Sequence, residues 1–255
     1  MTAIVAVALI ALQGQTNASA EVPSIPAPTT TTSTVPPTTV VPDPDPEPAP
    51  EPQPTTGTLR PGDRGPEVRA LQQRLRSLGY WVGTPDGTYG GLTVQAVTAF
   101  QKVEGMERDG IVGAATAAAL ASASRPSAGA DATGDLIEID KDRQVLFVVR
   151  HSQVEWVLNV STGTEEPYWV NGRTELADTP AGHWQVAWAF DGVDVGELGG
   201  LYRPRYFHRD GIAVHGYADV PAYPASHGCV RVSHAAMDWI WAEGVMPVGS
   251  AVWVH

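Results

Sequence analysis

The sequence contains a single cysteine, Cys229, among 255 residues, which excludes an intramolecular disulfide. Basic residues are also scarce, since 16 Lys and Arg face 28 Asp and Glu and the net charge is −12. This balance argues against nucleic acid as a partner, because phosphate binding requires a basic face. The apolar run at residues 3–12 is too short to cross a bilayer, so we expect no transmembrane span.

The first twenty residues have the apolar run of a signal peptide and a small-residue cleavage site, Ala18-Ser19-Ala20. No Lys or Arg precedes Arg60, so the positive segment of a signal peptide is missing. This indicates either a start upstream of Met1 or an atypical signal. We expect residues 1–20 to direct export to the cell wall or periplasm, where an oxidising environment penalises a free thiol.

Proline recurs with threonine and then with acidic residues over residues 21–57, which predicts an extended spacer without a core. Residues 58–122 differ. Apolar residues recur at helical spacing over 65–79 and 92–105, and an alanine-rich stretch covers 113–122. The pattern D-G-x-x-G occurs at 86–90 and 109–113, each time before a predicted helix. This segment is a small all-α module of three helices, and residues 123–133 form a second linker.

Residues 134–255 show the alternation of β-strands. Strands are predicted at 135–140, 144–150, 153–163, 183–190, 211–216 and 250–255. One late helix follows Ser233 as N-cap and stops at Gly244. We expect a mainly antiparallel β domain with one helix, and a core that includes Trp184, Trp188, Trp239 and Trp241. The fold class is therefore multidomain, a three-helix module followed by a mainly-β domain.

The lone cysteine lies in the stretch Ser226-His227-Gly228-Cys229, with His215 upstream. A cysteine nucleophile needs a base, donors for an oxyanion and a populated thiolate. His215 and His227 are both candidate bases, and their chemistry alone does not separate them. The N–H groups of Gly228 and Cys229 are candidate oxyanion donors. Two residues beyond the cysteine, an arginine at position 231 adds positive charge that favours the thiolate.

Other sites fit these residues less well. His215, His227 and Cys229 are three possible zinc ligands, but their spacing matches no common zinc motif. A papain-like site places its cysteine upstream of the histidine, which is the reverse of the order here. Sortases share the order but have much longer spacings. A buried structural cysteine leaves the preceding Ser-His-Gly unexplained.

The stretch HGYADVPAYPASHGCVR, residues 215–231, resembles the signature of the L,D-transpeptidases of the YkuD family. VSTG at 160–163 and TPAG at 179–182 are further marks of such domains. Residues 58–122 resemble the type-one peptidoglycan-binding module, through LRPGDRGPEVRALQQRLRSLGY, AVTAFQ and the two D-G-x-x-G turns. The resemblance implies a mainly-β catalytic domain over 134–255 whose site lies in a groove.

The resemblance also implies roles for individual residues. Cys229 is the nucleophile, His215 is the base, and the carbonyl of Gly216 orients that base. His227 is the second motif histidine, and Ser226 shapes the loop by hydrogen bonding. Position 231 is arginine where many members have asparagine, and both occur in the family.

The implied reaction is acyl transfer on peptidoglycan tetrapeptide stems. Attack on the carbonyl before the terminal D-alanine releases D-alanine, and the amine of a second stem then forms a 3→3 cross-link. With water as acceptor the enzyme is an L,D-carboxypeptidase, and a non-catalytic wall-binding scaffold is a further alternative. The resemblance implies no cofactor or metal and suggests acylation of Cys229 by carbapenems.

The expected partners are stem peptides and glycan, and we expect a monomer. Deletion of residues 59–122 is expected to weaken wall binding more than turnover of soluble stems. Residues 196–211 offer a candidate substrate-binding wall, the alternative being an ordinary aromatic loop with solvated arginines. The candidate binding residues there are Tyr202, Arg203, Arg205, Tyr206 and Phe207.

Overall fold

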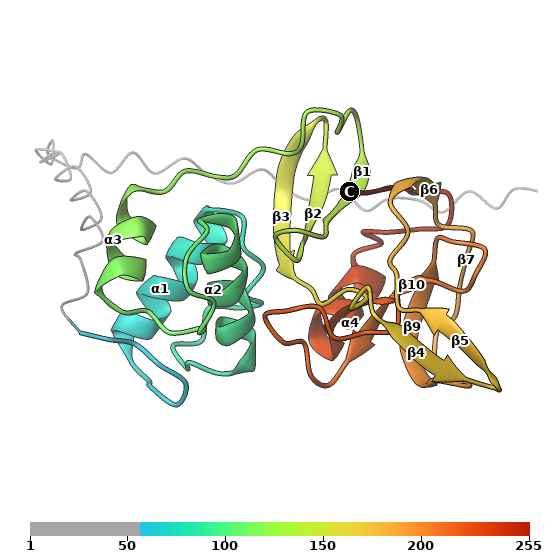
Figure 1. Cartoon of the computed structure of the whole chain (residues 1–255). Helices are drawn as coiled ribbons and strands as arrows, with labels where there is room; N and C mark the ends of the chain where they lie inside the picture. Colours follow the sequence, from blue (N-terminus) through green and yellow to red (C-terminus); the bar gives the residue numbers. More distant parts are fainter. Residues whose placement is uncertain (1–56) are drawn as a thin grey trace, which may run out of the picture. The chain divides into compact units, whose positions relative to one another are not determined.

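The computed structural model describes residues 57–255. The predicted signal peptide and almost all of the predicted spacer, residues 21–57, lie outside the described residues. Three helices, α1 (Pro66–Ser77), α2 (Gly91–Val103) and α3 (Ala114–Ser122), make up the helical region of residues 58–122 (Figure 1). None of the helices within residues 57–255 combines the length and hydropathy needed to cross a membrane.

The two D-G-x-x-G turns of the helical region are held by one repeated device. The side chain of Gln72 donates to the carboxylate of Asp86 at 2.9 Å and accepts the next residue's N–H at 2.8 Å. Gln101 does the same with Asp109, at 2.6 Å, and with the N–H of the glycine that follows, at 2.8 Å. Both glutamines are buried. Each turn is therefore fastened to the helix that precedes it.

The β domain consists of two five-stranded sheets and a separate hairpin. The first sheet has the order β3 (Gln153–Asn159), β2 (Val145–Arg150), β1 (Leu136–Asp140), β12 (Ala251–Val254), β6 (Gly182–Gln185). The second has the order β11 (Val230–Ser233), β10 (Ala213–Tyr217), β9 (Gly199–Tyr206), β7 (Trp188–Ala189), and β8 (Val193–Gly196) also pairs with β9. The hairpin joins β4 (Pro167–Val170) to β5 (Arg173–Leu176). Two pairs, β1 with β12 and β10 with β11, are parallel, and the other pairs are antiparallel.

The alternating stretch 183–190 is divided between the two sheets rather than forming one strand. Its first part belongs to β6, which pairs with β12, and Trp188 and Ala189 near its end form β7, which pairs with β9. Because β7 is an edge strand, Trp188 is 49% exposed and stacks on Tyr206 with ring centroids 3.8 Å apart. The prediction that Trp188 lies in the core is therefore wrong, whereas the other three tryptophans pack against a core cluster.

One hydrophobic core joins the two sheets to helix α4 (His234–Ala242). The helix begins as predicted, because the Ser233 hydroxyl accepts the N–H of Ala236 at 3.2 Å. Met237 and Ile240 are buried against the strands that carry the candidate site, since α4 packs on β9, β10 and β11. This core therefore fixes the positions of β10 and β11.

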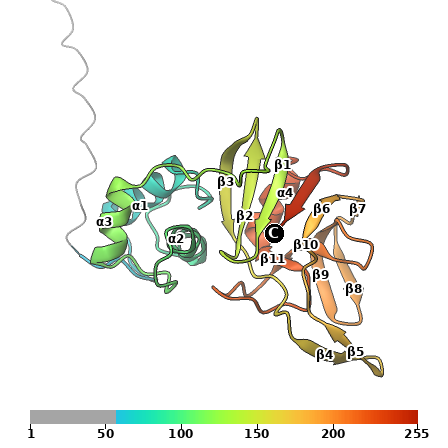
Figure 2. The same ribbon diagram turned by 45° about the horizontal axis from the view of Figure 1, so that its top comes forward.

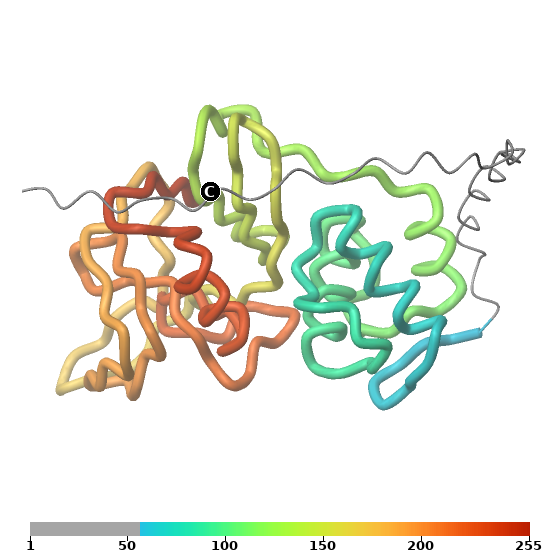
Figure 3. The backbone as a smooth tube through the Cα atoms, turned by 180° about the vertical axis from the view of Figure 1, so that it is seen from behind, coloured from blue at the N-terminus to red at the C-terminus, as the bar shows by residue number. Residues whose placement is uncertain are grey.

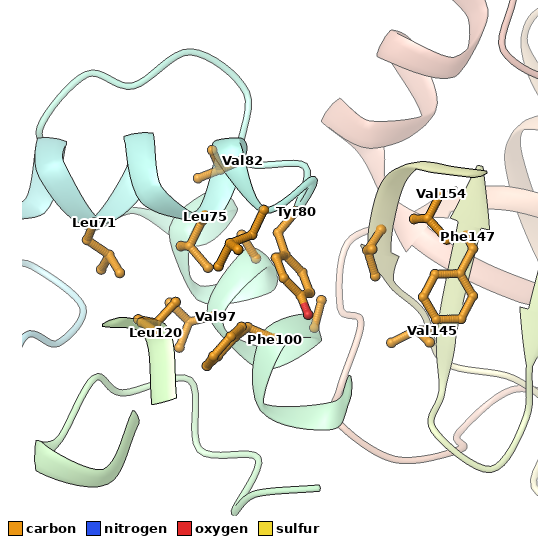
Figure 4. Packing of buried hydrophobic residues seen from close by; sticks show 14 of the residues in the cluster. Leu71, Leu75, Tyr80, Val82, Val97, Phe100, Leu120, Val145, Phe147 and Val154 are labelled. Carbon is orange, nitrogen blue, oxygen red and sulfur yellow. The ribbon is translucent and has the colours of Figure 1, made fainter. Parts of the chain in front are cut away.

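A second hydrophobic core joins the helical region to the first sheet. Figure 4 shows Tyr80 and Phe100 on one side and Val145 and Phe147 on the other, and all four are fully buried. The backbone takes part as well, because residues 79–81 exchange hydrogen bonds with Val157 of β3. Strands β1 and β2 are thus buried on both faces. The helical region and the β domain share a core.

The predicted second linker, residues 123–133, contains no helix or strand and runs from α3 to β1 (Figures 1 and 3). It is nevertheless fastened at several points. Arg125 donates to the backbone carbonyl of Glu155 at 2.5 Å. The N–H of Gly129 donates to the buried carboxylate of Glu138 at 2.9 Å. The segment is therefore a packed connection.

Candidate functional site

A groove of about 470 Å³ opens beside the second sheet and is lined by residues of that sheet, including β8, and of the β4–β5 hairpin. It brings together six of the residues that the sequence singled out: Tyr206, His215, Ser226, His227, Cys229 and Arg231. A neighbouring hollow of about 610 Å³ shares His227 and the hairpin but does not include Cys229.

Strands β10 and β11 pair in parallel and lie side by side (Figure 2). Their pairing brings the motif residues close to one another. His215 lies in β10 directly opposite Arg231 in β11. Cys229 immediately precedes β11. The pairing therefore brings Cys229 and His215 to the same part of the sheet, although the two residues are not adjacent in the sequence. The intervening segment, residues 218–229, is called the Cys229 loop below.

His215 is oriented by the backbone. Its side chain is 2% exposed, and its Nδ1 lies 3.0 Å from the carbonyl oxygen of Gly216. Because a carbonyl can only accept, Nδ1 carries the proton and Nε2 keeps a lone pair. Burial lowers the pKa of His215 to about 4, and the charges of Arg231 and His234 act in the same direction. The ring is therefore neutral at pH 7.

Cys229 is half-buried and lines the groove, and its thiol donates to the carbonyl of Gly211 at 3.7 Å. Burial raises the pKa of its thiol, whereas a hydrogen bond from the Ala213 backbone and the charge of Arg231 work against that rise. At neutral pH the resting pair is thus a thiol and a neutral imidazole. Such a pair performs nucleophilic catalysis only if the imidazole removes the thiol proton as the sulfur attacks.

His227 has a different environment from His215. It is exposed and its ring lies against that of Tyr168 on the β4–β5 hairpin, with centroids 4.6 Å apart.

No group of three His, Cys, Asp or Glu side chains within residues 57–255 is arranged to hold a metal ion.

The Cys229 loop is held by hydroxyl groups. Ser226 is buried, and its hydroxyl donates to the carbonyl of Cys229 at 2.5 Å and accepts the N–H of Gly228 at 3.0 Å. The Gly228 N–H, one of the two candidate oxyanion donors, is therefore engaged within the loop. A Cβ at Gly228 would lie 2.7 Å from the carbonyl oxygen of Asp178, at a φ of +137°, so only glycine fits.

Two threonines were recognised in the sequence only as marks of the family. The hydroxyl of Thr179 donates to the carbonyl of Gly228 at 2.6 Å and accepts the N–H of Gly163 at 2.9 Å. The carbonyl of Thr162 accepts the N–H groups of Ala225, at 3.1 Å, and of the next residue, at 3.0 Å. The positions of VSTG and TPAG in the sequence were the available signal, but their contact with the loop depends on the fold.

Arg231 lies over the ring of Tyr217, with its guanidinium carbon 4.1 Å from the ring centroid. Among residues 57–255 it makes no ion pair. A groove-lining cation of this kind can bind a carboxylate of a ligand.

Four of the five predicted substrate-binding residues do not line the groove. Arg203 pairs with Asp191 at 2.7 Å and with Asp238 at 2.8 Å, and Tyr202 donates to the same Asp238. Arg205 is buried over the ring of Trp241. Phe207 belongs to the core. Only Tyr206 lines the groove, and its hydroxyl donates to Asp194 at 2.8 Å.

The hairpin contributes groove residues that the sequence did not single out. Tyr168, Arg173 and Glu175 line both hollows. The hydroxyl of Tyr168 donates to Glu175 at 3.0 Å, and Arg173 pairs with the same carboxylate. These two short strands carry no catalytic motif and gave no signal of this role.

Comparison with known proteins agrees with the two-part organisation. Residues 64–120 match the family described as a peptidoglycan binding domain, and residues 134–254 match the L,D-transpeptidase catalytic domain, YkuD. The structure resembles the crystal structure of an L,D-transpeptidase from Xylanimonas cellulosilytica, with 47% identity and a TM-score of 0.74. The similarity covers 80% of this chain and 100% of that chain.

Curated relatives match over shorter segments. N-acetylmuramoyl-L-alanine amidase CwlL from Bacillus licheniformis is 48% identical over 71 residues, which are 27% of this chain and 20% of that protein. A second, probable N-acetylmuramoyl-L-alanine amidase of the same organism is 40% identical over 80 residues, 31% of this chain and 23% of that protein. The chain thus spans about a fifth of the length of these curated relatives.

Proposed function

Because this chain belongs to the L,D-transpeptidase family and has a peptidoglycan-binding domain before its catalytic domain, we propose that it is an exported enzyme that cross-links cell-wall stem peptides through Cys229. The observation that carries this proposal is the groove. It contains the only thiol of the chain together with a buried histidine whose Nδ1 is fixed by the Gly216 carbonyl.

In the first step the thiol proton of Cys229 passes to Nε2 of His215 as the sulfur attacks the carbonyl before the terminal D-alanine of a tetrapeptide stem. The backbone N–H of Cys229 is the proposed donor to the oxyanion, since the Gly228 N–H is engaged by Ser226. The imidazolium then gives its proton to the leaving nitrogen. D-alanine departs, and a thioester remains on Cys229.

In the second step the side-chain amine of another stem attacks the thioester. His215 accepts a proton from that amine, the carbon–sulfur bond breaks, and the sulfur leaves as a thiolate that takes this proton from the His215 imidazolium. The product is a 3→3 cross-link, and no cofactor enters the balance. Water in place of the amine would give the carboxypeptidase product.

The two hollows suit a reaction with two peptide substrates. We assign the donor stem to the hollow that contains Cys229, where Arg231 is available to its carboxylates. The acceptor stem then enters the adjacent hollow beside His227. The hairpin lines both, so it can contact both substrates.

The test is to incubate the protein with tetrapeptide stems and to follow D-alanine release and the mass of the dimer. We expect both products from the wild type and neither from Cys229→Ala. A carbapenem should add its mass to Cys229. Turnover that survives Cys229→Ala would overturn the proposal, and an excess of free tripeptide over dimer would identify a carboxypeptidase.

A further inference from the structure

The helical region contacts the catalytic domain through more than apolar side chains. Lys102 of α2 is 1% exposed, and its Nζ donates to the carbonyls of Gln144 at 2.8 Å and Val160 at 2.9 Å. Burial and the nearby charge of Arg108 lower the pKa of Lys102 to about 7. The amine can donate to both carbonyls in either protonation state. A buried amine bound only by backbone carbonyls fixes their position, because neither partner has water as an alternative.

One of the two residues that accept from Lys102, Gln144, also positions Thr162. The side chain of Gln144 donates to the Thr162 hydroxyl at 2.7 Å and accepts its N–H at 2.9 Å. Val160 lies two residues before Thr162 in the chain. Thr162 in turn holds the Cys229 loop through the N–H groups of Ala225 and its neighbour, as described above. An unbroken series of hydrogen bonds therefore leads from α2 to the residues just before Cys229.

Two further side chains of the helical region reach the loop directly. Gln95 of α2 donates to the carbonyl of Val220 at 3.2 Å, and Arg108 donates to the carbonyl of Ala222 at 3.3 Å. Asn159 of β3 ties this contact together, since it donates to Gln95 at 2.6 Å and to Val220 at 3.1 Å. The loop is thus held from the helical region at its start and, through Thr162, near its end.

From these contacts we propose that the helical region is a structural part of the catalytic site, in which Lys102, Gln95 and Arg108 are positioning residues for the Cys229 loop. The inference rests on the proposed function, and it goes beyond wall binding by making catalysis on soluble substrates depend on the helical region. None of these three residues lines the groove. They act through the backbone that presents Cys229.

The main variant is Lys102→Met, which keeps an unbranched side chain of similar length and removes the donors. In the full chain we expect amide hydrogen exchange of residues 222–228 to rise about tenfold, because the loop loses its support. The rate of carbapenem acylation should fall about tenfold, since a small misplacement of a nucleophile is costly. With stem substrates, kcat should fall while KM changes little. Arg60→Met is the control, because it removes an exposed cation of the same region.

Two milder variants keep the inference testable if Lys102→Met fails to fold. Gln95→Leu and Arg108→Met each remove one direct contact at a half-buried side chain, and each should raise loop exchange by a smaller factor. Arg108→Lys keeps a donor at this position, so it should restore part of the loop's protection from exchange that Arg108→Met removes. Loop exchange and acylation equal to the Arg60→Met control in all folded variants would overturn the inference.

The exchange experiment does not need turnover. If the wild type neither releases D-alanine nor forms an acyl-enzyme, the proposed function fails. The loop exchange of the variants, together with the rate at which iodoacetamide alkylates Cys229, would still decide whether the helical region positions the loop.

Discussion

The two walls of the catalytic groove differ in what supports them. The wall that carries Cys229 is held by Ser226, by Thr179 and, through Lys102, by the helical region. The opposite wall consists of β8 and the β4–β5 hairpin, which forms a two-stranded sheet of its own. Trp169 of the hairpin is 71% exposed and Val195 of β8 is 77% exposed, and neither lines the groove. The wall that carries Cys229 is called the supported wall below, and we propose that it presents the reacting groups while the other wall contacts the peptide chains.

The largest effect should follow deletion of residues 59–122, which removes the support behind the Cys229 wall. The sequence alone leads to the expectation of weaker wall binding with turnover largely kept. The shared core leads to the opposite expectation, because Val145, Phe147 and Val149 would be uncovered. Each fully buried apolar side chain contributes about 1.5–3 kcal/mol. Their sum is comparable with the net stability of a domain, about 5–15 kcal/mol.

We therefore expect the truncated protein to lose its cooperative thermal transition and its acylation by a carbapenem. Differential scanning calorimetry and mass spectrometry measure these two properties. A truncated chain that melts at the temperature of the full chain and acylates at the same rate would show that the supported wall does not need the helical region.

The next largest effect should come from a matched pair of glycines, one in each wall. In Gly228→Ala the new methyl would lie 2.7 Å from a backbone oxygen and 2.8 Å from Ile212 Cδ1. We expect acylation to slow about 100-fold, since a displacement of about 1 Å at a reacting group costs that much. Gly196 also lines the groove, but a Cβ there has no neighbour within 4 Å. Gly196→Ala should change the rate less than about threefold by the same geometric criterion.

Single-turnover acylation followed by mass spectrometry gives both rates. Similar losses in the two alanine variants would remove the distinction between the walls. Circular dichroism separates a local displacement from unfolding.

What the sequence predicted were features encoded locally. The D-G-x-x-G turns and helical spacings predicted the positions of α1, α2 and α3, and Ser233 predicted the start of α4. The stretch around Cys229 was recognisable because its residues follow one another closely. His215 could be chosen over His227 only through the resemblance, and that choice stays a prediction for a structure in which the one is buried and the other exposed.

What the sequence did not predict depends on partners far along the chain. Lys102 accounts for part of the support behind the loop, yet its two acceptors are 42 and 58 residues away. Arg203 and Arg205 were expected in the substrate wall, where an arginine can bind a stem-peptide carboxylate. Their partners, two aspartates and Trp241, come from other elements. The sequence alone does not show whether a charged side chain already has partners within the protein.

The pH dependence of acylation tests the chemistry of the supported wall. A base with a pKa of about 4, as burial gives His215, is about nine-tenths neutral at pH 5. A histidine of ordinary pKa would be only about one thirtieth neutral there. We therefore expect acylation by a carbapenem at pH 5 to keep most of its rate at pH 7. Below pH 5 the rate should fall as His215 takes up a proton.

The thiol supplies the complementary measurement. Alkylation of Cys229 by iodoacetamide requires the thiolate, and the raised pKa keeps the thiolate scarce at pH 7. The alkylation rate should therefore be low at pH 7 and should increase about tenfold per pH unit. An alkylation rate that is already at its plateau at pH 7 would indicate a thiolate–imidazolium pair and contradict the neutral pair. His227→Gln should leave both profiles unchanged.

The smallest effect is expected on the unsupported wall, at Trp169 of β4. Its side chain is 71% exposed, so Trp169→Gln should change the free energy of unfolding by no more than about 0.5 kcal/mol. The rate of carbapenem acylation should not change, because Cys229 and its supports are untouched. Because Tyr168 and not Trp169 lines the groove, kcat and KM for the stems should both stay near the wild-type values. A fall in kcat with constant KM would mean that this wall also positions the reacting groups, and the difference between the two walls would be lost.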